Sequence, residues 1–349
     1  INMMLMGFTM VTAASAANPA IERRRQICIK AAQLGARARE QARVRSIHPV
    51  CGSRRAVVLR NVSTEIPPLL YSFPGSGNTW VRLLLEQASS APTASRYLDP
   101  SIAAVMPHEC DNIETRSSCA GFVAIKVHPT FAGSMAIDSG SGRANFVGAN
   151  LMCGGAIAKA IFLVRHPMTA FWSDYQRKRL RRAGRAEHNH HSAITTAAWP
   201  KIRPAWEREA SQVYAVEYRD MWRPEKMSYG RWLQDHPGST DTEFLKFEEL
   251  IDKDRRIDAL RRTVSFSGFE VDNRTLECAF LHADEPAMHR PRGPNLVDAT
   301  VAWRLQLLDT VWRIVGEHAS KLGYGKDNWR RTALPPIGRV DLTQWARPR

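Results

Sequence analysis

The stretch LLYSFPGSGNTWVRLLLEQ, residues 69–87, decides the fold. Leu69 to Phe73 form a short apolar run between Pro67-Pro68 and Pro74-Gly75, which predicts a buried strand. The apolar residues of 78–87 then recur at helical spacing. Because two glycines stand where the predicted helix begins, the backbone can approach an anion and offer it free N–H groups. Strand, glycine loop and helix together predict an anion-binding turn.

This loop is not a Walker A motif. No G-x-x-x-x-G-K-[ST] pattern fits residues 73–82, and no Lys follows the glycines. ATP- or GTP-dependent phosphoryl transfer is therefore disfavoured. An ordinary helix start after a strand remains the simpler alternative.

Further strands and helices alternate along the chain. Strands are predicted at 122–127, 159–164 and 244–247, and helices at 167–182, 254–266 and 297–321, the last ending before Gly323. Strands that alternate with helices predict βαβ units and an α/β fold with a mainly parallel sheet. Residues 184–238 are rich in Trp, Arg and His and are interpreted as helical inserts that cover the sheet. Most of Trp199, Trp206, Trp222 and Trp232 are expected to pack within these inserts.

The net charge of +15 over 349 residues is unevenly distributed. Residues 18–60 carry eleven basic and two acidic groups, so most of the excess belongs to an N-terminal arm. We expect a targeting segment and basic disordered arm over 1–60, a folded domain over 61–330 and a tail over 331–349. The run from Met3 to Ala17 is typical of a secretory leader or part of a membrane anchor. An organelle transit peptide and a solvated leader without an address are the alternatives.

The six cysteines show no C-x-x-C spacing, which argues against a zinc ribbon. Cys110 and Cys119 are close enough in sequence to form a disulfide bond across a loop in an oxidising compartment. Six cysteines that are unrelated free thiols are an alternative of equal weight. The run His188-Asn189-His190-His191 lacks the companion ligands of a metal site and is interpreted as a solvated loop. No metal is expected.

Five segments together resemble a known family. The loop Phe73 to Arg82 resembles the 5′-phosphosulfate loop of sulfotransferases that use 3′-phosphoadenylyl sulfate (PAPS), most closely the WSC-domain-containing members. Lys126-Val127-His128 resembles the family's K-T-H segment, and Arg165-His166-Pro167 with Ser173 and Tyr175 its 3′-phosphate motif. Two softer matches are Phe247-Glu248-Glu249-Leu250, similar to Y-E-D-L, and Arg290-Pro291-Arg292-Gly293, similar to the R-K-G loop.

The resemblance implies a P-loop-NTPase-like three-layer α/β/α fold and a PAPS-dependent sulfotransferase. It implies His128 as catalytic base with Lys126 beside it, and no metal. The nucleotide would be held by the loop, by the 3′-phosphate motif and by the C-terminal loop. These binding residues are Pro74, Gly75, Ser76, Gly77, Asn78, Thr79, Trp80, Arg165, Ser173, Arg292 and Gly293.

The chain departs from the family pattern in ways that leave open which cation serves the leaving phosphate. Common cytosolic members carry Lys where this chain has Gly75, so another cation must serve the leaving phosphate; Lys126 and Arg82 are candidates. Phe247 replaces a Tyr, and Glu248 is expected to hold the sheet edge.

The partners expected are PAPS and a hydroxyl acceptor, with a carbohydrate favoured. No nucleic-acid partner is expected, because most of the charge lies in the arm. The alternatives are another P-loop-type nucleotide enzyme such as a kinase, an inactive homologue that binds adenosine 3′,5′-bisphosphate (PAP), or a binder that acts through its basic arm. A secretory pathway location, in the Golgi lumen or membrane, is favoured over plastid or cytoplasm; the oligomeric state is left open.

Overall fold

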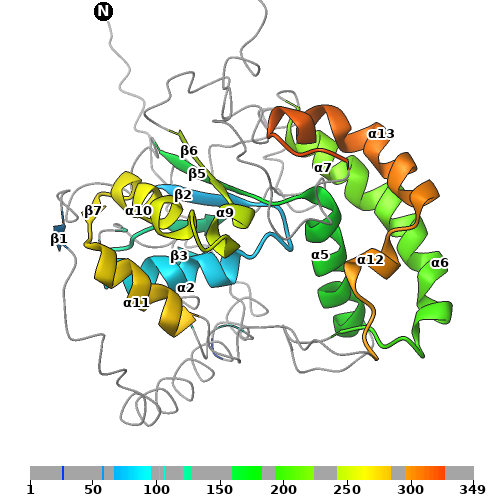
Figure 1. Ribbon diagram of the computed structural model, residues 1–349, viewed down its shortest axis with the longest axis horizontal. Helices are drawn as coiled ribbons and strands as arrows, with labels where there is room; N and C mark the ends of the chain where they lie inside the picture. The colour runs from blue at the N-terminus through cyan, green and yellow to red at the C-terminus, as the bar shows by residue number, and fades with distance from the viewer. Residues whose placement is uncertain are drawn as a thin grey trace, which may run out of the picture.

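The computed structural model describes most of the predicted folded domain (Figure 1). The described residues are 67–95, 121–127, 159–182, 193–223, 242–283 and 295–326, together with residues 26, 57–58, 102, 106 and 119. Among them, no helix is long and apolar enough to cross a membrane.

A five-stranded sheet with all strands parallel forms the centre of the molecule. The strand order is β3 (Ala94–Ser95), β4 (Ile125–Val127), β2 (Leu69–Ser72), β5 (Ala160–Val164) and β6 (Thr242–Lys246). Tyr71 and Phe244 both pair with Phe162, and the three rings stack across the sheet. Parallel pairing brings the carboxyl ends of all five strands to one edge, which confirms the predicted α/β class.

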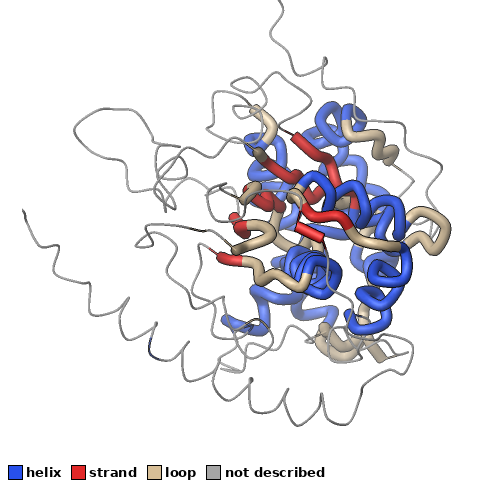
Figure 2. The backbone as a smooth tube through the Cα atoms, turned by 90° about the vertical axis from the view of Figure 1, so that its left-hand side faces the viewer, coloured by secondary structure: helices blue, strands red, loops and turns tan. Residues whose placement is uncertain are grey.

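Three helices cover one face of this sheet. They are α2 (Asn78–Ser89), α10 (Arg256–Phe266) and α11 (Asn273–Ala283), and Figure 2 shows helices on both sides of the strands. Leu70, Ile161 and Leu245 point toward these helices and share a buried cluster with them. The short helix α9 (Phe247–Ile251) and a two-stranded antiparallel pair, β1 (Val57–Val58) with β7 (Phe269–Glu270), lie on the same side.

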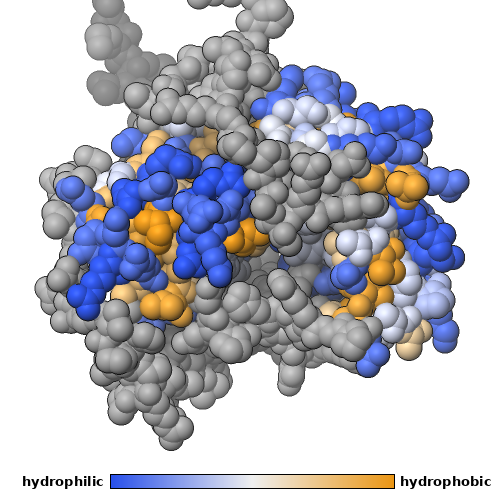
Figure 3. All heavy atoms as spheres, in the orientation of Figure 1, coloured by the Kyte–Doolittle hydropathy of each residue, from blue (hydrophilic) through white to orange (hydrophobic). Residues whose placement is uncertain are grey.

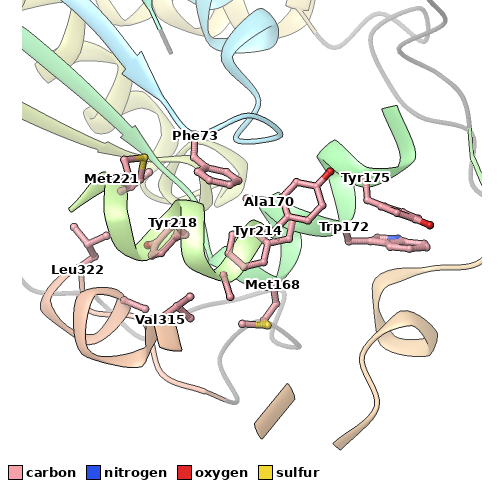
Figure 4. Packing of buried hydrophobic residues seen from close by; sticks show 14 of the residues in the cluster. Phe73, Met168, Ala170, Trp172, Tyr175, Tyr214, Tyr218, Met221, Val315 and Leu322 are labelled. Atoms are coloured by element: carbon pink, nitrogen blue, oxygen red, sulfur yellow. The ribbon is translucent and has the colours of Figure 1, made fainter. Parts of the chain in front are cut away.

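The strand residues that point the other way join a second cluster with the remaining helices. These helices are α5 (Pro167–Arg182), α6 (Trp199–Glu209), α7 (Ala215–Met221), α12 (Ala299–Ala302) and α13 (Leu305–Lys321); a π-helical segment, η3 (Ala210–Tyr214), joins α6 to α7. Figure 1 shows them gathered near the carboxyl ends of the strands. Figure 4 shows Phe73, which follows β2, directed at Tyr218 of α7, with ring centroids 5.7 Å apart.

The tryptophans of the inserts are packing residues, as predicted. Trp206 and Trp222 are fully buried, and Trp199 packs against the same cluster. The indole of Trp206 lies 5.0 Å from that of Trp303 and donates a hydrogen bond to the Ala302 carbonyl. Trp232 lies outside the described residues. Figure 3 shows hydrophilic residues interspersed with hydrophobic ones over the described surface of one face.

Several boundaries differ from the sequence prediction, among them the following three. The strand predicted at 244–247 runs from Thr242 to Lys246, and Phe247 opens α9. The helix predicted at 297–321 breaks into α12 and α13, because Trp303 turns extended and its indole donates to the Met168 carbonyl at 3.0 Å. The strand predicted at 122–127 is regular only from Ile125.

Other predictions concern residues that lie partly or wholly outside those that the structure describes. Cys119 and Cys278 are both disulfide-bonded. Cys110, the partner predicted for Cys119, lies outside the described residues. Most of the predicted arm 1–60, the histidine run and the tail from 331 also lie outside them.

Candidate functional site

The loop between β2 and α2 turns sharply at the carboxyl edge of the sheet. Gly75 and Gly77 adopt left-handed backbone angles, with φ of +86° and +88°, and the Ser76 N–H donates to the Phe73 carbonyl at 3.1 Å. Helix α2 then begins at Asn78 without a capping side chain and without an acidic residue in its first turn. The first N–H groups of a helix lack intrahelical partners and carry the positive end of its dipole. The loop therefore favours an anion.

Both glycines are required by space as well as by backbone angle. A Cβ on Gly75 would lie 2.2 Å from the Ala170 carbonyl oxygen and 2.9 Å from the Asp174 amide nitrogen of α5. A Cβ on Gly77 would lie 2.4 Å from the Phe247 ring. The lysine that common sulfotransferases carry at the first position thus has no room here, which is a structural reason for Gly75.

Arg165 connects the third predicted motif to this loop. It follows β5 directly, and its Nη1 donates to the Gly75 carbonyl at 2.8 Å. Its guanidinium carbon lies 4.2 Å from the centre of the Phe247 ring, a distance typical of a cation–π contact. Burial lowers the pKa of Arg165, while Glu248 acts in the opposite direction. The structure therefore brings a half-buried cation to the glycine loop.

Ser173 lies on the turn of α5 that packs against Gly75, between Ala170 and Asp174. The neighbouring Asp174 is fully buried, and it forms ion pairs with Arg177 at 2.5 Å and Lys178 at 2.9 Å. Burial would raise the pKa of Asp174, but the two cations outweigh it and hold that pKa below its usual value. These ion pairs steady the turn that carries Ser173.

Buried polar atoms beside the loop test whether a polar ligand fits. Ser76 Oγ and Trp80 Nε1 are buried and have no hydrogen-bond partner within the described parts of the chain. Asn78 Nδ2 donates to Ser72 Oγ at 2.8 Å, while its Oδ1 has no partner there. A buried donor without a partner costs about 1–3 kcal/mol. The Ser76 hydroxyl is such a donor within the glycine turn itself, and it fits a ligand that carries phosphate or sulfate.

The remaining predicted residues divide into described and undescribed. Lys126 is 6% exposed and lies one residue before the end of β4. Arg82 is fully buried, and its Nε donates to Thr93 Oγ1 at 2.8 Å, just before β3 begins. Because β3 is parallel to β2, Thr93 stands at the amino edge, so the geometry disfavours Arg82 as a cation for this loop. His128, Arg292 and Gly293 lie outside the described residues.

The sequence did not reveal how Phe247 is used. Its ring lies against Gly77, beneath Arg165, and 5.6 Å from the Trp80 ring. The sequence signals were an aromatic residue at the end of a predicted strand and its place in a segment that resembles Y-E-D-L, and neither specifies which loop the ring would contact. Within the described ranges, no group of three or more His, Cys, Asp or Glu side chains could hold a metal ion.

The parallel five-stranded sheet with helices on both faces is consistent with a P-loop-like three-layer α/β/α fold, and open sheets of this kind place ligands at the carboxyl ends of their strands, where the glycine turn and Arg165 lie. No family model matches the chain, and no solved structure matches it. The chain is 26% identical over 250 residues to a WSCD family member of Drosophila pseudoobscura pseudoobscura, a match that covers 71% of this chain and 66% of that protein.

Two further relatives carry the same family name. A WSCD family member of Drosophila melanogaster is 24% identical over 215 residues, and one of Aedes aegypti is 23% identical over 215 residues. Each match covers 62% of this chain and 54% of the relative. The chain thus spans between half and two thirds of the length of the curated relatives that it matches.

Proposed function

We propose that this protein is a sulfotransferase that moves a sulfuryl group from PAPS to an acceptor hydroxyl or amine, on a carbohydrate, and releases PAP. The observation that carries the proposal is the hydrogen bond from Arg165 to the Gly75 carbonyl. This hydrogen bond fixes the distance between Arg165, the proposed site for the 3′-phosphate, and the glycine turn, the proposed site for the 5′-phosphate. A nucleotide that carries both groups needs two such sites at a constant separation. The distant similarity to proteins named WSCD family members agrees with the resemblance of the glycine loop to WSC-domain-containing sulfotransferases.

In this proposal the loop from Pro74 to Trp80 holds the 5′-phosphosulfate. Its backbone N–H groups and the Ser76 hydroxyl donate to the phosphate oxygens, and Arg165 and Ser173 hold the 3′-phosphate. Arg165 can make a bidentate contact with phosphate. Arg292 and Gly293 complete the nucleotide site from the C-terminal loop.

The reaction requires the acceptor to lose a proton as it attacks sulfur. His128, directly after β4, is proposed to take that proton, since a neutral imidazole suits general base catalysis near neutral pH. Negative charge grows on the leaving phosphate, and fixed donors aimed at it lower the barrier. With Gly75 in place of lysine, Lys126 is the cation proposed to serve there.

The disulfides of Cys119 and Cys278 support an oxidising compartment, because disulfides persist in the secretory pathway and are rare in the cytosol. A Golgi lumen or membrane location, reached through an N-terminal leader or anchor, is therefore proposed. Localisation of the tagged full-length protein against Golgi and plastid markers tests it; a plastid or cytosolic signal would contradict it.

Ligand-induced thermal stabilisation separates this function from its alternatives. PAP is expected to raise the melting temperature, and ATP with magnesium to leave it unchanged; stabilisation by ATP alone would favour a kinase-type enzyme. Transfer of labelled sulfate from PAPS to a panel of glycans and small hydroxyl compounds then identifies the acceptor. His128→Ala is expected to abolish transfer while PAP still binds.

A second candidate is a homologue that binds PAP without transferring sulfate. The lack of room for a lysine at Gly75 favours it. PAP binding without transfer to any member of the acceptor panel would decide for this candidate.

A further inference from the structure

His166, the residue after Arg165, is held in one tautomer and in its neutral form by its surroundings. His166 is 1% exposed, and its Nδ1 accepts a hydrogen bond from the Met168 N–H at 3.3 Å. Its Nε2 lies 2.9 Å from the Gly325 carbonyl oxygen, which can only accept, so Nε2 carries the proton and donates. Burial lowers the pKa of His166 to about 4, so the ring is neutral near pH 7. His166 therefore connects the start of α5 to the chain beyond α13.

The backbone of His166 is fixed separately by Glu248. The carboxylate Oε1 accepts the His166 N–H at 2.8 Å, and Oε2 accepts the Tyr324 hydroxyl at 2.8 Å. Tyr324 is 2% exposed, and its ring lies 5.2 Å from the imidazole of His166. Glu248 thus joins three segments far apart in sequence: the end of β5, the start of α9 and the chain after α13.

This network lies directly beside the guanidinium of Arg165. The peptide that Glu248 holds is the one between Arg165 and His166, and Phe247, the neighbour of Glu248, supports the guanidinium from below at 4.2 Å. Residues 247 and 248 therefore constrain both ends of Arg165, its backbone and its charged group. Rotation of the held peptide would move the guanidinium away from Gly75.

We propose that Glu248 and Tyr324 are positioning residues that aim Arg165 at the 3′-phosphate of the bound nucleotide. The proposal rests on the proposed function for the identity of the ligand. Glu248 then does more than hold the sheet edge, and the segment that follows α13 acts on the nucleotide site through its contacts with Glu248 and His166. The network selects a nucleotide with a 3′-phosphate over one without it.

A comparison of PAP with 5′-AMP isolates the 3′-phosphate, because the two ligands differ in that group alone. Tyr324→Phe and Glu248→Gln are each expected to weaken PAP binding by about three- to tenfold, the effect of one impaired hydrogen bond, and to leave 5′-AMP binding unchanged. Isothermal titration of the full chain measures both affinities. Arg165→Lys serves as the reference, because its ratio of PAP to 5′-AMP affinity shows how much is lost when the contact with the 3′-phosphate is itself disrupted.

Two matched variants control for the chemistry of the substitutions. Tyr214→Phe removes a buried hydroxyl that has no partner among the described residues, and Glu217→Gln neutralises a half-buried carboxyl on α7. Both are expected to leave the ratio of PAP to 5′-AMP affinity at its wild-type value. Since Tyr324→Phe changes a single atom, it tests the proposal even where Glu248→Gln fails to fold.

The outcomes separate this inference from the function on which it rests. An equal loss of PAP and 5′-AMP affinity in Tyr324→Phe, or no loss in either, would show a structural role and overturn the positioning. An unchanged ratio in Arg165→Lys would instead overturn the phosphate assignment, and with it the proposed function. A ratio that falls in Arg165→Lys but not in Tyr324→Phe or Glu248→Gln rejects the positioning alone.

Discussion

Substitution of Gly75 by alanine tests whether the loop is shaped by α5. The left-handed angle at Gly75 costs a residue with a Cβ about 1–2 kcal/mol. The added methyl would also overlap the Ala170 carbonyl and the Asp174 amide, which are helix backbone and cannot rotate away as a side chain can. Overpacking of this kind typically costs about 1–3 kcal/mol more. Gly75→Ala is therefore expected to destabilise the protein by about 2–5 kcal/mol.

Gly121 provides the matched control for this substitution. Its φ is +90°, but a Cβ there would meet nothing within 4 Å, so Gly121→Ala pays the backbone cost alone, about 1–2 kcal/mol. Urea unfolding of both variants, with a constant m-value, measures the difference. Equal destabilisation of the two variants would refute the packing of Gly75 against α5. PAP binding is expected to fail in Gly75→Ala and to survive in Gly121→Ala.

Other predictions concern the surroundings of the loop. His166 has a pKa of about 4 in the folded protein against 6.5 in the unfolded chain, so the unfolded chain binds more protons between these values. The free energy of unfolding should therefore fall as pH drops from about 6.5 to 4, by about 3 kcal/mol in full. A His166→Gln variant should show a flatter dependence of unfolding free energy on pH, and equal dependence in the two proteins would contradict a neutral, buried His166. Phe247→Leu removes the ring beneath Arg165 and is expected to weaken PAP binding by about two- to tenfold in titration, with unchanged affinity counting against the cation–π contact. Trp303→Phe leaves the Met168 carbonyl without its donor and should lower unfolding stability by about 1–3 kcal/mol in urea, whereas an unaffected midpoint would show that the hydrogen bond is dispensable.

Local patterns predicted the strands and helices that carry the site. The apolar run at 69–73 and the periodicity after it gave β2 and α2, and Pro167 marked the first residue of α5. These elements are encoded within a few residues of sequence, by burial pattern and by backbone preference. The split between α12 and α13 was missed because Trp303 leaves the helix for a carbonyl 135 positions earlier in the chain.

The site residues also divide into those that local sequence predicts and those whose contacts depend on the fold. Residues 73–82 identified the glycine turn, and Arg165 and Ser173 were predicted from the resemblance of their segment to the sulfotransferase 3′-phosphate motif. The contacts that join these motifs could not be read from the chain. Arg165 reaches Gly75 across 90 positions, and Glu248 reaches His166 across 82. Such pairs depend on how strands are ordered in the sheet, which no local pattern specifies.

By itself, the sequence determined that a strand, a glycine turn and a helix begin the domain, that the sheet is mainly parallel, and that Arg165 directly follows a strand. Only the tertiary structure decided that Gly75 excludes a lysine, that Phe247 supports Arg165, and that Arg82 is bound at the opposite edge. The physical reason is that backbone preference and hydrophobic periodicity act over one or two turns of chain. Steric exclusion and buried hydrogen bonds, in contrast, act between whichever segments the packed sheet brings into contact.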